Sequence, residues 1–337
     1  MSRKLISAAL FLAAMAAAGG AMAQMMRPPP FMGGIPGVAQ FQAIQMQRHQ
    51  ARTLLYREAL EELRRNPAAA DVPECSAGQA SKNGRCLARV APEAAAPTDS
   101  RPRRRLAVLV GNNAYAAPIP PLETPIADVS QIAGVLQSRF GFEVRIIKDA
   151  GKAGIIEALN NIAAEARPDD AVLLMYAGHG YLLDEINMGY WIPVDASVKT
   201  AQGWISNSDI SKLLAAIPAR QLILISDSCY SGSLTKEQKV APGRELKPEE
   251  VLKQRSVLVL SSGDDEPVSD EGKEGHSIFA WNLIKALRST GGITPGTQVW
   301  NSVRTGVSKE YPQRPQYGAV VSAGHAEGGD FLFLTPR

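Results

Sequence analysis

Residues 171–180 read AVLLMYAGHG, and residues 222–232 read LILISDSCYSG. Each segment is a short, continuous apolar run that leads directly into a loop containing glycine. Such a run is typical of a strand that is buried on both faces of a parallel sheet. In open α/β sheets, ligands bind at the carboxyl ends of the strands. The two segments therefore predict a parallel sheet with a functional site where these strands end.

The sequence on either side of these segments alternates between apolar runs and amphipathic stretches. Further strands are predicted at 106–110, 142–147, 257–260 and 331–334, and helices at 126–140, 155–166, 208–216, 277–287 and 297–309. Strands that alternate with helices form a mostly parallel sheet with helices on both faces. We therefore expect residues 105–335 to form an α/β domain around a mostly parallel six-stranded sheet.

His179 and Cys229 stand in the two glycine-containing loops. Nucleophilic cysteine catalysis needs a thiol, a base that activates it, and exposed N–H groups that stabilise an oxyanion. A lone cysteine is more often a small buried hydrophobic residue, and a lone histidine is more often structural. Neither alternative explains why both residues follow apolar strands. The pattern therefore favours a catalytic Cys–His dyad.

The segments YAGHG and SDSCYSG, with Cys229 placed 50 residues after His179, resemble the caspase–metacaspase clan. The resemblance covers residues 105–334 and includes the loop SSGDDE at 261–266, HSIF at 276–279 and PQRPQ at 312–316. It implies a cysteine endopeptidase that works through an acyl-enzyme, with Cys229 as nucleophile and His179 as general acid and base. The N–H groups of Gly180 and Cys229 would then form the oxyanion hole.

The resemblance also implies a specificity pocket. Metacaspases hold a basic P1 side chain between two acidic residues, which match Asp227 and, in the segment LETPIADV, Asp128. Two carboxylates suit arginine or lysine and would repel an acidic P1 residue. The sequence departs from the family pattern at Pro125, Ala127 and Ala177, which replace a cysteine, an asparagine and a serine. Asp128 also suits the first turn of a helix, where the dipole favours an acid.

No metal site is expected. Three cysteines are too few for a four-cysteine zinc site. Many metacaspases use calcium, but here few acids follow His179, Lys236 occupies one of the family's acidic positions, and the acidic run 264–271 lacks EF-hand spacing. We therefore expect no cofactor, and calcium is not favoured.

The N-terminus has the three parts of a secretory signal peptide over residues 1–23. Arg3 and Lys4 precede a short apolar run, and AMA precedes Gln24. The alternative is an uncleaved anchor. Export implies a periplasmic or secreted protein in an oxidising compartment. There, Cys75 and Cys86 are expected to form a disulfide that closes a small polar loop, rather than two unpaired thiols, and Cys229 is left as the odd cysteine.

Between the signal peptide and the α/β domain, we expect two segments. Residues 24–66 contain a Pro- and Gly-rich linker followed by an amphipathic helix. This helix either packs on the main domain or acts as a partner-binding helix or propeptide. Residues 67–104 form a second linker, rich in Ala and Pro, that carries the expected disulfide loop and ends in a basic cluster.

The charge balance bears on partners. Lys and Arg number 36 and Asp and Glu number 33, so the net charge is +3. This balance argues against a nucleic-acid partner. A stable membrane anchor is not expected, because the N-terminal apolar run is too short to span a bilayer comfortably and no cysteine follows the predicted cleavage site. The expected partners are protein or peptide substrates with a basic P1 residue, and the basic loop 233–255 makes self-cleavage an option. The alternatives are a catalytically silent caspase-like protein that binds a partner in the cell envelope, and an envelope protein in which Cys229 is structural.

Overall fold

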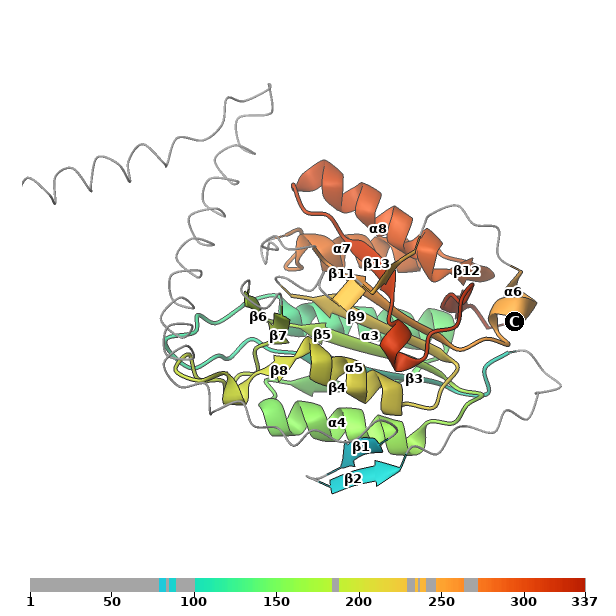
Figure 1. Cartoon of the computed structure of the whole chain (residues 1–337). Helices are drawn as coiled ribbons and strands as arrows, with labels where there is room; N and C mark the ends of the chain where they lie inside the picture. Colours follow the sequence, from blue (N-terminus) through green and yellow to red (C-terminus); the bar gives the residue numbers. More distant parts are fainter. Residues whose placement is uncertain are drawn as a thin grey trace, which may run out of the picture. The chain divides into compact units, whose positions relative to one another are not determined.

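The described structure centres on one mixed sheet, seen in Figure 1. The computed structural model describes residues 101–183, 188–228, 234–235, 237–240, 247–263 and 272–336, with the backbone of residues 79–82 and 85–88. In sheet order, the strands are β10 (Gln238–Lys239), β13 (Gln316–Ala319), β11 (Ser256–Ser261), β9 (Gln221–Asp227), β5 (Ala171–Ala177), β3 (Arg105–Gly111) and β4 (Glu143–Lys148).

Five neighbouring strands, from β11 to β4, run parallel; β13 pairs antiparallel with β11, and β10 pairs antiparallel with β13. Every residue of β5 and β9 is buried, as expected for central strands that are covered on both faces. The edge strand β4 is partly exposed along its length. The predicted mostly parallel sheet is confirmed, with the two-residue β10 added at one edge.

One strand lies elsewhere than expected. The apolar segment at 331–334 contains a strand, β14 (Leu332–Leu334), but β14 pairs with β12 (Ile293–Pro295) in a separate two-stranded sheet. The sixth long strand of the main sheet is β13, whose sequence QYGA has no apolar run. Hydrophobicity therefore identified a strand here but not its partner.

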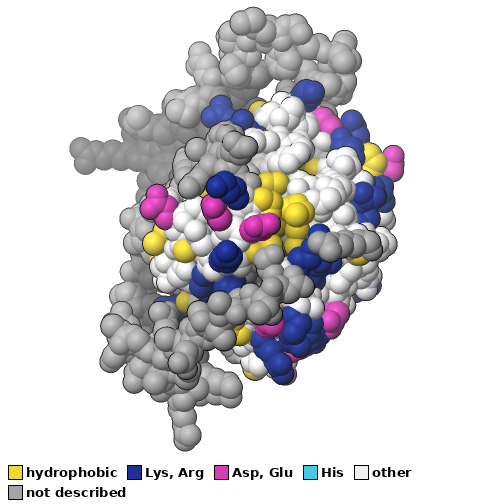
Figure 2. Space-filling view, turned by 90° about the vertical axis from the view of Figure 1, so that its right-hand side faces the viewer, with side chains coloured by type: hydrophobic (Ala, Val, Ile, Leu, Met, Phe, Trp, Pro, Cys, Tyr) yellow, Lys and Arg dark blue, Asp and Glu magenta, His cyan; other side chains and the backbone are white. Residues whose placement is uncertain are grey.

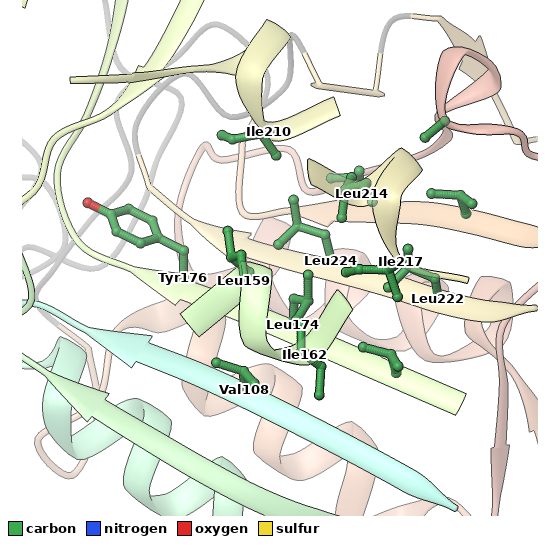
Figure 3. Packing of buried hydrophobic residues seen from close by; sticks show 14 of the residues in the cluster. Val108, Leu159, Ile162, Leu174, Tyr176, Ile210, Leu214, Ile217, Leu222 and Leu224 are labelled. Atoms are coloured by element: carbon green, nitrogen blue, oxygen red, sulfur yellow. The ribbon is translucent and has the colours of Figure 1, made fainter. Parts of the chain in front are cut away.

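Helices cover both faces of the sheet (Figure 1). One face carries α4 (Lys152–Glu165) and α5 (Asn207–Ala216), and the other carries α3 (Pro125–Phe140), α7 (Ile278–Ser289) and α8 (Gly296–Glu310). All five helices lie within three residues of the predicted bounds. Figure 3 shows the core under α4 and α5, where Ile162 and Leu214 pack with strand residues such as Leu174 and Leu224.

Short elements complete the described fold. The sequence did not predict a three-stranded sheet of β6 (Gly180–Leu183), β7 (Met188–Trp191) and β8 (Ile205–Ser206). The remaining elements are the strand pair β1 (Gln79–Lys82) and β2 (Arg85–Ala88), the helix α6 (Pro248–Val251), and the 3-10 turns Ala201–Gly203 and Val321–Ala323. Among the residues that the structure describes, no helix has both the length and the hydrophobicity needed to cross a bilayer.

The described charged residues on one face of the molecule are mixed in sign. On the face shown in Figure 2, lysine and arginine side chains lie among acidic ones, around a small group of hydrophobic side chains. This face therefore carries no single continuous basic surface.

Candidate active site

His179 lies two residues beyond the end of β5, immediately before β6. The intervening Gly178 is needed for steric reasons, because a Cβ atom there would lie 2.6 Å from the Tyr115 hydroxyl and 2.8 Å from the Tyr176 hydroxyl. Both hydroxyls bind the backbone of His179. The Tyr115 oxygen accepts a hydrogen bond from the His179 N–H (2.9 Å), and the Tyr176 hydroxyl lies 2.9 Å from the His179 carbonyl. The two tyrosines therefore fix the backbone that carries the imidazole.

The imidazole of His179 is held by a backbone carbonyl. Its Nε2 atom lies 2.8 Å from the carbonyl oxygen of Pro120. Because a carbonyl can only accept, Nε2 carries the hydrogen, and in the neutral ring Nδ1 is then the basic atom. The ring also packs against Tyr115 at a centroid distance of 4.6 Å, and His179 is only 3% exposed. This arrangement fixes both the orientation and the tautomer of the histidine.

Pro120 is positioned by the hydrophobic residues beside it. Ile119 and Leu122 are buried, and they pack in one cluster with Tyr181 and Trp204 around the small sheet. Burial of these neighbours holds the loop after β3 over His179. Burial also raises the pKa of Tyr115 to about 12, so its hydroxyl stays protonated at neutral pH.

The end of β9 lies beside the end of β5. Ala177 is the register partner of Asp227 in this parallel pair, and the Gly178 N–H donates to the Asp227 carbonyl (3.2 Å). The chain is anchored as far as Ser228, whose hydroxyl lies 3.1 Å from that of Ser226. Cys229 is the next residue and lies outside the described residues. The described segments thus bring His179 and the residue before Cys229 to the same edge of the sheet.

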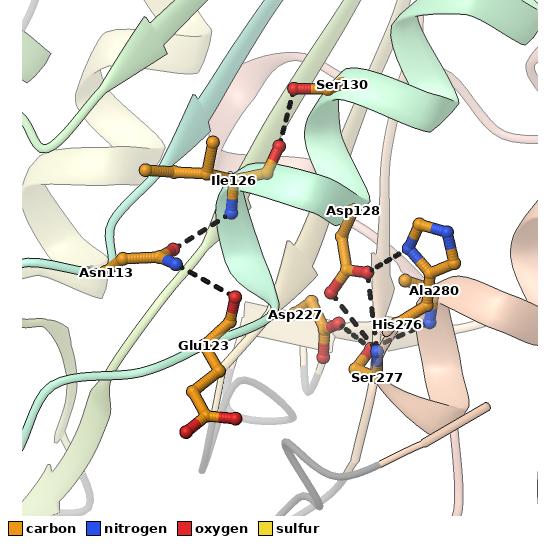
Figure 4. Close-up of polar contacts among 9 residues, drawn as sticks. All are labelled: Asn113, Glu123, Ile126, Asp128, Ser130, Asp227, His276, Ser277 and Ala280. Carbon is orange, nitrogen blue, oxygen red and sulfur yellow. Dashed lines mark hydrogen bonds and ion pairs between the residues drawn. The ribbon is translucent and has the colours of Figure 1, made fainter. Parts of the chain in front are cut away.

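Asp128 and Asp227 lie together although they come from different elements (Figure 4). Asp128 is in the first turn of α3, and Asp227 is the last residue of β9. Ser277, which precedes α7, contacts both acids. Its hydroxyl donates to Asp227 Oδ2 (2.7 Å), and its N–H lies 3.3 Å from both carboxylate oxygens of Asp128. Asp128 is 1% exposed and Asp227 is 7% exposed.

The surroundings of Asp128 change its acidity. Burial, followed by the charge of Asp227, raises the pKa of Asp128 to about 8. The Nδ1 atom of His276 lies 2.7 Å from Asp128 Oδ1, and burial lowers the pKa of this histidine. The raised pKa favours the neutral, protonated form of Asp128, and the lowered pKa favours the neutral form of His276. The site therefore contains a pair of buried acids with a third titratable group in direct contact.

The structure describes only some of the other residues that were predicted to form sites. Gly180 begins β6 opposite Trp191. Cys86 lies in β2, whereas Cys75 and both cysteine side chains lie outside the described residues, so the disulfide stays a prediction. Among the residues with described side chains, no group of three or more His, Cys, Asp or Glu could hold a metal ion. Lys236 and the acidic run 264–271 lie outside this description.

The sequence did not predict several contributors to this site. Pro120 acts through its carbonyl, which any residue could supply, so no residue type indicates the contact. Tyr115 and Tyr176 carry no motif. Ser277 could have been found as a helix N-cap, because a serine precedes the apolar run IFAW and its oxygen accepts from the Ala280 N–H (2.9 Å). His276 could be placed beside α7, but its contact with Asp128 spans 148 residues of sequence.

Comparison with known proteins identifies the family. A family model described as "Caspase domain" matches residues 104–322, which is more than half of the chain. This chain therefore belongs to the caspase-domain family and is a cysteine peptidase, as the motifs predicted.

Its relatives include metacaspases from fungi and plants. Metacaspase-1B of Aspergillus fumigatus is 24% identical over 303 residues, covering 68% of this chain and 72% of its own. Metacaspase-9 of Arabidopsis thaliana is 29% identical over 151 residues, covering 41% of this chain and 46% of its own. A solved structure from Geobacter sulfurreducens covers 69% of this chain and 95% of its own, with a TM-score of 0.46 and 19% identity, which is too loose to bear on function.

Proposed function

We propose that this chain is an exported endopeptidase that cleaves after arginine or lysine, with Cys229 as nucleophile and His179 as general acid and base. The observation that carries the proposal is the register of Ala177 with Asp227. His179 follows Ala177 by two residues, and Cys229 follows Asp227 by two residues. Parallel strands in register therefore direct both loops to the same edge of the sheet.

The hydrogen bond to Pro120 supports the role of His179. With Nε2 occupied, Nδ1 takes the proton of the Cys229 thiol as the sulfur attacks the scissile carbonyl carbon. The imidazolium then gives this proton to the leaving amine, and a thioester remains on the enzyme. Water attacks the thioester, His179 accepts a proton from that water, and the carboxylic acid product leaves as the thiol is restored.

The pairing of β6 with β7 supports Gly180 as an oxyanion donor. The Ile192 N–H donates to the His179 carbonyl (3.0 Å), which makes Gly180 and Trp191 the next, non-hydrogen-bonded pair of the ladder. The N–H of Gly180 therefore points away from β7. Together with the N–H of Cys229, it would stabilise the charge that develops on the carbonyl oxygen.

The buried pair of acids supports a basic P1 residue. Asp128 and Asp227 are nearly inaccessible to water, and Ser277 contacts both carboxylates. Buried carboxylates are stabilised by a cation that hydrogen-bonds to them. An arginine or lysine side chain of the substrate would supply that cation, whereas an aspartate would add to the repulsion.

A panel of fluorogenic peptides with Arg, Lys or Asp at P1 tests the proposal. Cys229→Ala and His179→Ala should each remove nearly all turnover and leave the thermal unfolding transition in place. Asp227→Asn should lower kcat/KM for the Arg peptide by roughly 10- to 150-fold, because a hydrogen bond to a charged group contributes about 1.5–3 kcal/mol.

Asp209→Asn is a matched control, because Asp209 lies in the first turn of α5, outside the proposed site. It should leave kcat/KM unchanged. A wild-type preference for Asp at P1 would show that the acidic pocket is wrong, and equal turnover by Cys229→Ala would show that the nucleophile is wrong.

The remaining parts of the proposal concern export and processing. A cleaved signal peptide at residues 1–23, a Cys75–Cys86 disulfide and a reduced Cys229 belong together, and N-terminal sequencing with non-reducing peptide mapping tests all three. The basic segment 233–255 was predicted as a loop but contains β10 and α6. It is proposed as a self-cleavage site, so new N-termini after Lys or Arg should occur in wild type and not in Cys229→Ala. Activity should not require calcium, and it should survive a chelator.

A further inference from the structure

His276 is a neighbour of the acidic pair that the proposed reaction does not use. It approaches Asp128 from the start of α7, and the two side chains face each other in Figure 4. Its Nδ1 atom lies 2.7 Å from Asp128 Oδ1, and its side chain is 13% exposed. The ring stacks nearly parallel to Trp281, at 13° and a centroid distance of 6.3 Å. The imidazole is therefore packed on one side and bonded to the acid on the other.

The backbone before His276 is built to hold this position. Glu274 has φ of 56° and Gly275 has φ of 80°, so two consecutive residues adopt left-handed conformations. The left-handed region is unfavourable for a residue such as Glu274. A Cβ atom at Gly272 would lie 1.8 Å from the His276 carbonyl oxygen, so only glycine fits there. This constrained turn fixes where α7 begins and places the imidazole against Asp128.

One proton is available for the contact between His276 and Asp128. At 2.7 Å, either the nitrogen or the oxygen must carry a hydrogen, which a neutral imidazole can supply through Nδ1–H, so the titratable proton is one more than this hydrogen. Asp227 from β9 raises the pKa of Asp128, and hydrogen bonds from Ser277 and Thr124 lower it. On His276, Glu274 raises the pKa and Arg288 of α7 lowers it. With the proton, the His276–Asp128 pair has no net charge, and without it the pair carries one negative charge.

We propose that His276 is a specificity-determining residue whose imidazole shares one proton with Asp128, and that a basic P1 side chain binds as this proton leaves. The inference rests on the proposed function, because it concerns the same pocket. It makes substrate binding depend on pH through a residue that does not touch the scissile bond. Binding of arginine forms no covalent bond. One proton passes to the solvent, the neutral ring keeps a hydrogen on Nδ1 that it donates to Asp128, and the ionised Asp128 then faces the guanidinium.

The proposal gives a definite expectation for His276→Asn. The amide nitrogen of asparagine can donate to Asp128 as Nδ1–H does, but asparagine cannot take up a proton at neutral pH. The substitution removes the state in which the proton lies on the ring. Removing a protonated state lowers the overall affinity of the pair for the proton. The variant should therefore bind arginine at lower pH than the parent does.

The test uses the full-length Cys229→Ala protein and a fluorescent peptide with Arg at P1, followed by anisotropy from pH 5.5 to pH 9. Below the pKa of the pair, Kd should rise by about tenfold per pH unit, because one proton competes with one peptide. In the His276→Asn variant, this rise should begin at lower pH, and the two proteins should bind equally at pH 9. For a peptide with citrulline, the neutral analogue of arginine, Kd should not rise in this way as the pH falls.

Glu274→Gln is the charge control. Glu274 is exposed, and its carboxylate favours protonation of His276. Because charges near the surface interact weakly, this variant should change the pH at which Kd begins to rise much less than His276→Asn does.

Calorimetry of the same binding reaction in two buffers of different ionisation enthalpy provides a second measurement. Binding of the Arg peptide to the parent should release close to one proton at pH 7, and the variant should release fewer. If the variant does not fold, the parent alone decides, since release of no proton overturns the proposal. Failure of the Arg peptide to bind at any pH overturns the basic pocket and this inference together. Tight binding with identical pH profiles in parent and variant overturns this inference alone.

Discussion

Replacing Asp128 with asparagine should stabilise the protein in alkaline solution while it weakens the binding of arginine. The folded-state pKa of Asp128 is about 8, against an ordinary value of 3.8. The folded protein therefore binds this proton more tightly than the unfolded chain does. A raised pKa gives stability that is complete below pH 4 and is lost as the pH rises toward 8. Asparagine carries no such proton and so avoids the loss.

The magnitude follows from the two pKa values. Between pH 5 and pH 9, the wild type should lose about 4 kcal/mol of unfolding free energy relative to Asp128→Asn, at 1.36 kcal/mol per pKa unit. Asparagine also places an N–H group near the Ser277 N–H, and this mismatch costs about 1–3 kcal/mol. That cost does not vary with pH, so the difference between the two pH values isolates the effect of the raised pKa of Asp128, which comes from burial and from the charge of Asp227.

Urea denaturation at pH 5, 7 and 9, with wild type and variant side by side, measures the difference. Asp209→Asn, in the first turn of α5, serves as the matched Asp-to-Asn control. The reasoning is refuted if the stability gap between wild type and Asp128→Asn is the same at pH 5 and pH 9, because Asp128 would then ionise as readily in the folded protein as in the unfolded chain.

Three further substitutions test other parts of the site and the core. Tyr115→Phe removes the acceptor for the His179 N–H, so it should lower the free energy of unfolding by about 1–3 kcal/mol and should lower kcat more than it changes KM. Ser277→Ala should lower the free energy of unfolding by about 1–2 kcal/mol, because α7 loses its N-cap, and Ser277→Thr should retain most of this stability. Equal losses in the two variants would contradict the capping role of the hydroxyl. Leu174→Ala should lower the free energy of unfolding, measured by urea denaturation, by about 2–5 kcal/mol and leave KM unchanged. A raised KM would mean that the core shapes the pocket.

The sequence predicted those parts of the fold that depend on local hydrophobicity. Strands β5 and β9 are apolar at nearly every position because both faces are covered, so periodicity was not needed to find them. The five helices that flank the sheet were predicted from their apolar faces. The edge strand β13 was not, because QYGA pairs through its backbone and lacks a hydrophobic signal.

The candidate site was predictable only where a side chain follows a strand. His179 and Asp227 lie at strand ends, which the chain topology brings to one edge of the sheet. The Pro120 carbonyl was not predictable, because a backbone group leaves no trace in residue identity. The contact of His276 with Asp128 joins α3 to the turn before α7, two segments that are distant in sequence and that meet only in the folded protein. These contacts depend on tertiary packing rather than on any local pattern.

The energetics of the acidic pair distinguish a structural role from a functional one. An acid near a helix N-terminus gains about 0.3–2 kcal/mol from the dipole, and Ser277 already caps α7 by accepting the Ala280 N–H. The rise in the pKa of Asp128 from 3.8 to about 8 corresponds to roughly 5–6 kcal/mol against its ionised form. The helix terminus cannot offset a penalty of that size, and a neutral residue would serve the fold better. A cation bound beside Asp128 would offset it, and the basic side chain of the proposed substrate is one group that could do so.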